Sequence, residues 1–160
     1  MISFKEFLKD QEARLRGEDA SRDRLRQDWE NAVYQLTQQM TAWLKESDPD
    51  RLVKLYEDTV VRDEGTTGRC HLVELQFWLG RQRVVISPVA RDILGPRFRP
   101  FNDGNWSGRV DLVGDPNIYT LFRFSRDGQL DTWYLRDPRD LDLVPLSRET
   151  FDGALVDLFS

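Results

Sequence analysis

The strongest constraint on the fold is a stripe of apolar residues between Ser21 and Glu46. Spacings of three and four residues place these side chains on one face of an α-helix. At 1.5 Å per residue, a helix over 21–46 would be about 39 Å long, which exceeds what a domain of 160 residues needs to cover its own sheet. We therefore expect a protein partner or a homodimer through the 21–46 helix. The stripe consists of Leu25, Trp29, Ala32, Val33, Leu36, Met40, Trp43 and Leu44.

Further helices are predicted by their capping residues. Ser3 with Glu6 forms a capping-box pattern and predicts a helix over 3–16, which Gly17 would end. The Asp48–Pro49 pair predicts the start of a third short helix over 49–58. Near the C-terminus, Ser147 is a suitable cap for a helix over about 148–159.

The pattern changes to β from Val60 onward. Alternating segments separated by turn residues predict an antiparallel meander of about five strands. The first strand, 70–79, would place His71, Val73 and Leu75 on one face. Apolar residues on both faces of several strands indicate that helices or a partner cover much of the second face.

The expected fold class is therefore α+β, within a single domain over 1–160. Its parts would be a helical N-terminal part over 1–58, an antiparallel sheet over 60–137 and a C-terminal helix over 147–159.

Composition indicates a cytoplasmic protein. The single cysteine leaves no intramolecular disulfide, and no apolar run approaches the roughly 18 residues that a membrane span needs. The first ten residues lack the apolar core of a signal peptide. The net charge of −5 gives no general attraction to nucleic acid or anionic lipid.

The sequence offers little for catalysis by histidine or thiol. His71 is the single histidine and is adjacent to Cys70. Neighbouring strand residues point to opposite faces, so these two side chains would not form a nucleophilic pair. Structural zinc needs about four Cys or His ligands, and no phosphate-loop or dinucleotide motif is present. We expect no cofactor.

Carboxylates remain as candidate catalytic groups. Glu74, Asp111 and Asp103 would together suit Mg²⁺ and a metal-dependent hydrolase or nuclease. All four lysines, however, lie at or before Lys54 and none lies among the predicted strands. The alternative is structural: Glu74 would pair with an arginine such as Arg83, and Asp111 with Arg109.

A connection over 90–107 carries the other candidate site. Its arginines alternate with aromatic residues, a pattern in which arginine holds phosphate while an aromatic ring stacks on a base. The acidic net charge makes a nucleic-acid-binding module an alternative rather than the leading interpretation. The same residues would equally form a recognition surface for an acidic or phosphate-bearing partner. The candidate binding residues here are Arg97, Phe98, Arg99, Trp106 and Arg109.

These observations favour a non-enzymatic protein-interaction or regulatory module. It would act through the long amphipathic helix and through an aromatic, arginine-rich sheet and loop surface. Trp78 and Trp133 are candidate exposed anchors, because tryptophan contributes strongly to interface energetics. A small-ligand pocket between sheet and helices is a further alternative.

Overall fold

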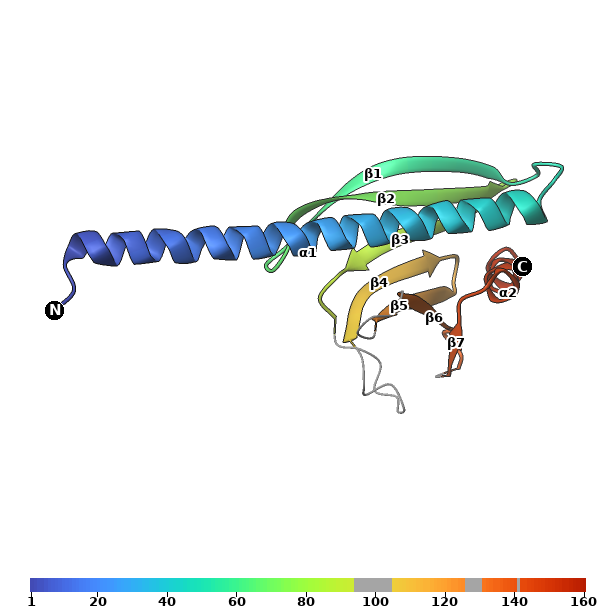
Figure 1. The fold of residues 1–160 in the computed structure, drawn as a ribbon. Coiled ribbons are helices and arrows are strands. Elements are labelled where there is room, and N and C mark those ends of the chain that lie inside the picture. The colour runs from blue at the N-terminus through green and yellow to red at the C-terminus, as the bar shows by residue number, and fades with distance from the viewer. Residues whose placement is uncertain (94–104, 126–130, 141) are drawn as a thin grey trace.

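The computed structural model describes residues 1–93, 105–125, 131–140 and 142–160. Its described part holds two helices and one antiparallel sheet of seven strands, so the fold class is α+β (Figure 1). In chain order the elements are α1 (Phe4–Ser47), β1 (Lys54–Glu64), β2 (Gly68–Leu79), β3 (Gln82–Ala90), β4 (Asn105–Val113), β5 (Ile118–Ser125), β6 (Thr132–Arg136), β7 (Leu143–Pro145) and α2 (Arg148–Leu158).

The element α1 is one continuous helix of 44 residues, about 66 Å long at 1.5 Å per residue. The prediction of two helices separated at Gly17 is wrong. A glycine inside a helix costs only about 1 kcal/mol relative to alanine. Ion pairs between successive turns, Arg14 with Glu18 and Arg16 with Glu12, support the helix on both sides of Gly17. The predicted capping box of Ser3 is present.

The predicted helix over 49–58 is also wrong, because the chain reverses there and enters β1. The Asp48 carboxylate accepts hydrogen bonds from the backbone N–H groups of Leu52 and Val53, both at 2.9 Å. Arg51 has φ of 54°, which a right-handed helix does not continue. From Lys54 onward the chain pairs with β2 along its whole length.

The sheet is a simple meander in the order β1–β2–β3–β4–β5–β6–β7. The prediction of about five strands over 60–137 omitted both edges: β1, which begins at Lys54, and the three-residue β7, which ends at Pro145. The start of β1 could not be recognised from the sequence, because the spacing of Leu52, Leu55 and Tyr56 also fits a helix.

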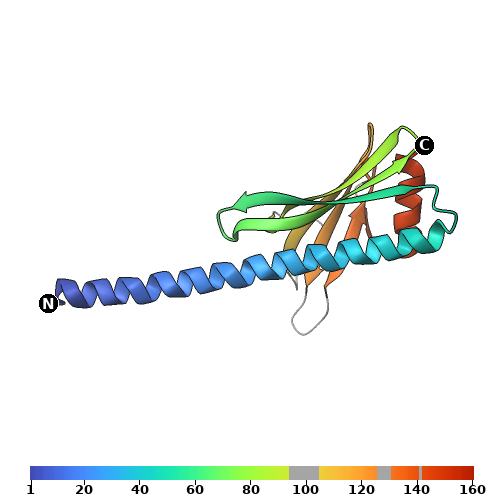
Figure 2. The ribbon, with the colours of Figure 1, turned by 90° about the horizontal axis from the view of Figure 1, so that it is seen from above.

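The C-terminal half of α1 packs on one face of the sheet (Figure 2). The helix α2 closes one end of this core, and the Phe151 ring lies 5.7 Å from that of Trp43 and 6.3 Å from that of Phe77. The stripe of the 21–46 helix is thus covered by the chain's own sheet from Trp29 onward. Core side chains with 0–1% exposure include Trp29, Val33, Met40, Leu72, Leu75, Phe77, Val84, Ile86, Leu112, Leu121 and Phe151.

The first turns of α1 project past the sheet (Figures 1 and 2). We call residues 4–21 the arm; its side chains are exposed except for half-buried Gln11. The body begins where Arg22 lies against the β1–β2 turn, with its Cδ 3.3 Å from the position that a Cβ on Gly68 would occupy. Within the described residues, neither helix is apolar enough over a sufficient length to cross a membrane.

Candidate functional site

The arm carries an apolar stripe that nothing in the described part of the chain covers. Phe4, Leu8 and Leu15 are 73%, 49% and 52% exposed, and Phe7 beside them is 45% exposed. The Phe4 and Phe7 rings stack with centroids 6.3 Å apart. By the helical period, Phe4, Leu8 and Leu15 lie on the same face as Trp29. One stripe is therefore buried at the C-terminal half of α1 and exposed at the N-terminal part.

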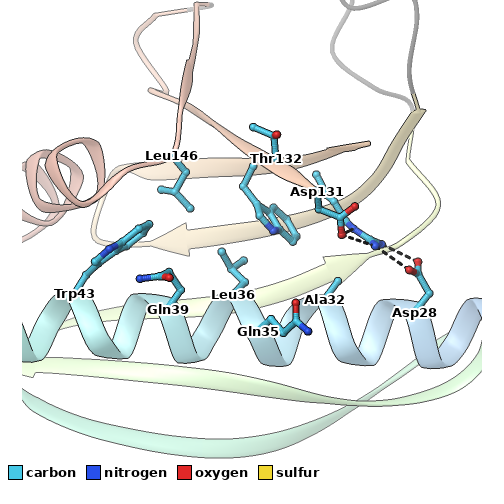
Figure 3. Close-up of a pocket in the computed structure, with 11 residues that line it drawn as sticks. Asp28, Ala32, Gln35, Leu36, Gln39, Trp43, Asp131, Thr132 and Leu146 are labelled. Carbon is cyan, nitrogen blue, oxygen red and sulfur yellow. Dashed lines mark hydrogen bonds and ion pairs between the residues drawn. The ribbon is translucent and has the colours of Figure 1, made fainter. Parts of the chain in front are cut away.

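A groove of about 540 Å³ lies beside the buried half of α1 (Figure 3). Gln35, Gln39 and Trp43 line it from α1, and Trp133 lines it from β6. The Trp133 ring also packs against that of Trp29, with centroids 6.3 Å apart. The groove combines two indole surfaces with two amide side chains, which is a mixed apolar and hydrogen-bonding lining.

An ion cluster around the buried Arg123 closes one end of this groove (Figure 3). Arg123, only 5% exposed, donates to both carboxylate oxygens of Asp28 at 2.8 Å. Its Nε donates to Asp131 at 2.7 Å. Arg91 adds a further contact to Asp28 at 3.3 Å. These bonds tie α1 to β5 and to the start of β6.

The contact between Asp28 and Arg123 favours the charged form of both side chains. Hydrogen bonds from Arg123, opposed by partial burial, hold the pKa of Asp28 below its usual range. Burial alone would lower the pKa of Arg123, but the hydrogen bonds with Asp28 and Asp131 outweigh it and raise that pKa. Because each group already has its counter-charge, we interpret the cluster as a structural link rather than as a catalytic group.

Glu74 and Asp111 lie on one face of the sheet, on either side of Ser87. Ser87 is paired with Asp111 across β3 and β4, and its hydroxyl donates to Glu74 at 3.0 Å. Arg109 donates to both oxygens of Asp111, at 2.9 and 3.1 Å, as the structural alternative predicted. The arginine near Glu74 is Arg62, at 3.7 Å.

The remaining parts of the predicted hydrolase site are not assembled in the described chain. Arg83, the expected partner of Glu74, lies instead over the Trp78 ring at 5.5 Å. Asp103 falls outside the described residues. Among the residues that the structure describes, no group of three His, Cys, Asp or Glu side chains is placed to hold a metal ion.

Cys70 and His71 do not form a pair. The Cys70 side chain is buried and its thiol donates to the Thr67 hydroxyl at 3.3 Å, whereas His71 is exposed. Burial raises the pKa of the Cys70 thiol, so the thiolate is disfavoured. The register of β1 with β2 is unbroken, so His71, Val73 and Leu75 alternate along one side of β2 as predicted. The expectation that His71 lies on an apolar face is wrong, because His71 is exposed whereas Leu75 on the same side is buried.

The predicted aromatic anchors are only partly exposed. Trp78 is half-buried and its indole N–H donates to Gln76 at 3.2 Å. Trp133 is half-buried in the groove. Trp106 packs on the sheet face away from α1, in a cluster with Phe122, Phe124 and Tyr134 at 4.7–6.1 Å. Arg97, Phe98 and Arg99 lie outside the described residues.

Sequence reasoning missed the cluster around Arg123. A signal was present, since Arg123 interrupts the apolar run of β5, and a buried guanidinium requires carboxylate partners. Its partner Asp28, however, lies 95 residues away, and no local pattern connects the two.

No protein-family model matches this chain, and neither a curated protein nor a solved structure matches it.

Proposed function

We propose that the protein is a non-enzymatic protein-interaction module that contacts its partner through the arm. The observation that carries this proposal is the single apolar stripe of α1, which its own sheet buries from Trp29 onward and leaves exposed in the arm. A partner with an apolar groove would complete the burial of the stripe, as in other complexes in which an amphipathic helix lies in a groove.

The energetics support this assignment. Fully burying one exposed leucine or phenylalanine contributes about 1.5–3 kcal/mol, and the arm presents Phe4, Phe7, Leu8 and Leu15 within four turns. An isolated helix of this length is marginal in water, so most natural helices gain their stability from packing. The arm lacks such packing within the described part of its own chain, and an interface would supply it.

Site-specific photo-crosslinking tests the proposal. A photoreactive amino acid is placed at Leu8 in the full-length protein, in cells that naturally make it. The matched control is the same group at Ala13, which is exposed on the opposite side of the arm. We expect covalent adducts from position 8 and few from position 13. Absence of adducts at position 8, or equal yields at both positions, would contradict the proposal.

A second candidate function is small-ligand binding in the groove beside Trp133. The observation that favours it is the volume of about 540 Å³, which lies within the usual range of ligand pockets, about 300–1,000 Å³. Gln35 and Gln39 would orient a polar ligand between the two tryptophans. A ligand that fills the groove would contact both helix and sheet and would raise the melting temperature.

A thermal-shift screen of metabolites measures the change in melting temperature. A true ligand raises the melting temperature of the wild type, and the shift decreases in Gln39→Ala. Gln38→Ala is the control, because Gln38 is exposed on the same helix but does not line the groove. An equal loss of the shift in both variants would count against binding in the groove.

A further inference from the structure

A second groove, predominantly apolar, lies at the far end of α1 from the arm. We call it the far-end groove; its volume is about 410 Å³. Leu52 and Val156 on its rim are 69% and 70% exposed, and Leu79 is 38% exposed. Large apolar side chains gathered around a concave surface are typical of an interaction site. The apolar lining comprises Leu44, Leu52, Val53, Leu79, Leu155, Val156 and Phe159.

The charged residues that line the far-end groove are acidic. They are Asp48, whose carboxylate accepts from two backbone N–H groups, and Asp152, which accepts from the Ser47 hydroxyl at 2.8 Å. Neither carboxylate has an ion-pair partner among the described residues. The groove therefore fits an apolar segment that also carries positive charge.

The tip of the arm has this chemistry. Phe4 and Leu8 lie on its apolar face, and Lys5 lies at the edge of that face beside Leu8. Within the part of the chain that the structure describes, Lys5 forms no ion pair. Lys5 is thus free to approach the carboxylates of a groove that receives the phenylalanine and leucine side chains.

The arm cannot reach the groove of its own chain. Phe4 and Leu44 are separated by about 60 Å of continuous helix, at 1.5 Å per residue. The two ends of α1 lie at opposite ends of the molecule (Figures 1 and 2). Any arm tip in the far-end groove must therefore come from another molecule.

We propose that the arm tip of one copy of this chain binds in the far-end groove of a second copy, with Lys5 facing Asp48 and Asp152. This inference rests on the proposed function, since it names the partner of the arm. The contact joins two different surfaces. A complex of two chains held by one such contact therefore leaves one arm and one groove free, unless the assembly closes on itself.

Four full-length variants test the contact. Leu8→Glu places a charge on the binding face of the arm, and Ala13→Glu places the same charge on its opposite side. Val156→Lys places a cation in the groove, and Val144→Lys makes the same change at an exposed position on β7. All four positions are exposed, and circular dichroism verifies that each variant keeps the fold.

Light scattering over a range of concentrations measures the assembly. The wild type and both controls are expected to have a mass above the 18.8 kDa of one chain. Leu8→Glu and Val156→Lys should weaken association on the order of tenfold or more, because each buries an unpaired or repelled charge. A mixture of these two variants should recover complexes of two chains, since one supplies an intact groove and the other an intact arm.

The outcomes separate the two proposals. A wild type that remains one chain at all concentrations, or a mixture that does not recover complexes, overturns the self-association. If the photoreactive group at position 8 then gives adducts with a different protein, the proposed function stands without this inference. If it gives no adducts at all, both are wrong.

Discussion

Arg123 holds three segments of the chain together through one guanidinium. Asp28 and Asp131, its two carboxylate partners, are 42% and 34% exposed at their side chains. Solvent therefore screens part of each interaction, and the cost of breaking one is smaller than for a fully buried pair. The larger cost falls on Arg123, because its guanidinium stays buried when one of its carboxylate partners is removed.

Replacing Asp28 with Asn is expected to destabilise the fold by about 1–3 kcal/mol, because a buried guanidinium loses one of its two counter-charges. Urea unfolding of the full chain measures the change. Asp23→Asn is the control, since Asp23 pairs with Arg26 at the surface and such pairs contribute about 0–1 kcal/mol. Equal effects of the two substitutions would contradict this assignment.

The penalty of Asp28→Asn should also depend on pH. The pKa of Asp28 is lowered in the folded protein, chiefly by hydrogen bonds from Arg123. The stability from its carboxylate is therefore present above the ordinary aspartate pKa and is lost as the pH falls through the lower, folded value. Wild type and variant should differ most near neutral pH and converge in strong acid, as followed by urea unfolding at each pH.

At the scale of elements, α1 consists of one helix in two environments. Its C-terminal half is packed in the core, whereas the arm is held by capping and by pairs between successive turns. Backbone amides of the arm should therefore exchange with solvent much faster than those around Val33 and Leu36. Gly17 lies in the arm, and apart from its chain neighbours and its own helix backbone no described atom lies within 4 Å of a Cβ placed there.

Gly17→Ala is accordingly expected to stabilise the arm alone. The substitution favours the helix by about 0.5–1 kcal/mol, which slows local amide exchange by about two- to fivefold. Hydrogen exchange with mass spectrometry measures the arm separately from the core. The exchange of core amides should not change, and a change there of similar size would mean that the arm and the body open together.

The elements show what local sequence determines. The stripe from Trp29 to Leu44 and the caps Ser3 and Ser147 are local patterns, and the structure contains the helix and both caps. Gly17 does not end α1, and Pro49 does not begin a helix. A glycine cost of about 1 kcal/mol is offset by neighbouring turns, and the Asp48–Pro49 turn led into β1 because its long-range pairing with β2 outweighs the local preference.

At the scale of the whole molecule, the features that define candidate sites are non-local. The sequence predicted the α+β class, because patterns of period 3.6 and period 2 occupy separate parts of the chain. It did not predict that Arg123 meets Asp28, nor that Leu52 and Val156 border one groove. These contacts depend on how the curved meander and α2 close around α1, and such geometry is not encoded in spacing along the chain.

The packing of the C-terminal half of α1 on the sheet affects the entropy cost of binding a partner at the arm. Starting a helix is unfavourable because several residues must be ordered for one hydrogen bond, whereas extending an existing helix is much easier. The sheet fixes the turns from Trp29 onward, so the arm grows from a nucleus that is already formed. In the association proposed above, a partner would meet a segment with less conformational freedom left to lose. The sheet would thereby strengthen binding at the arm, with which it makes no contact among the described residues.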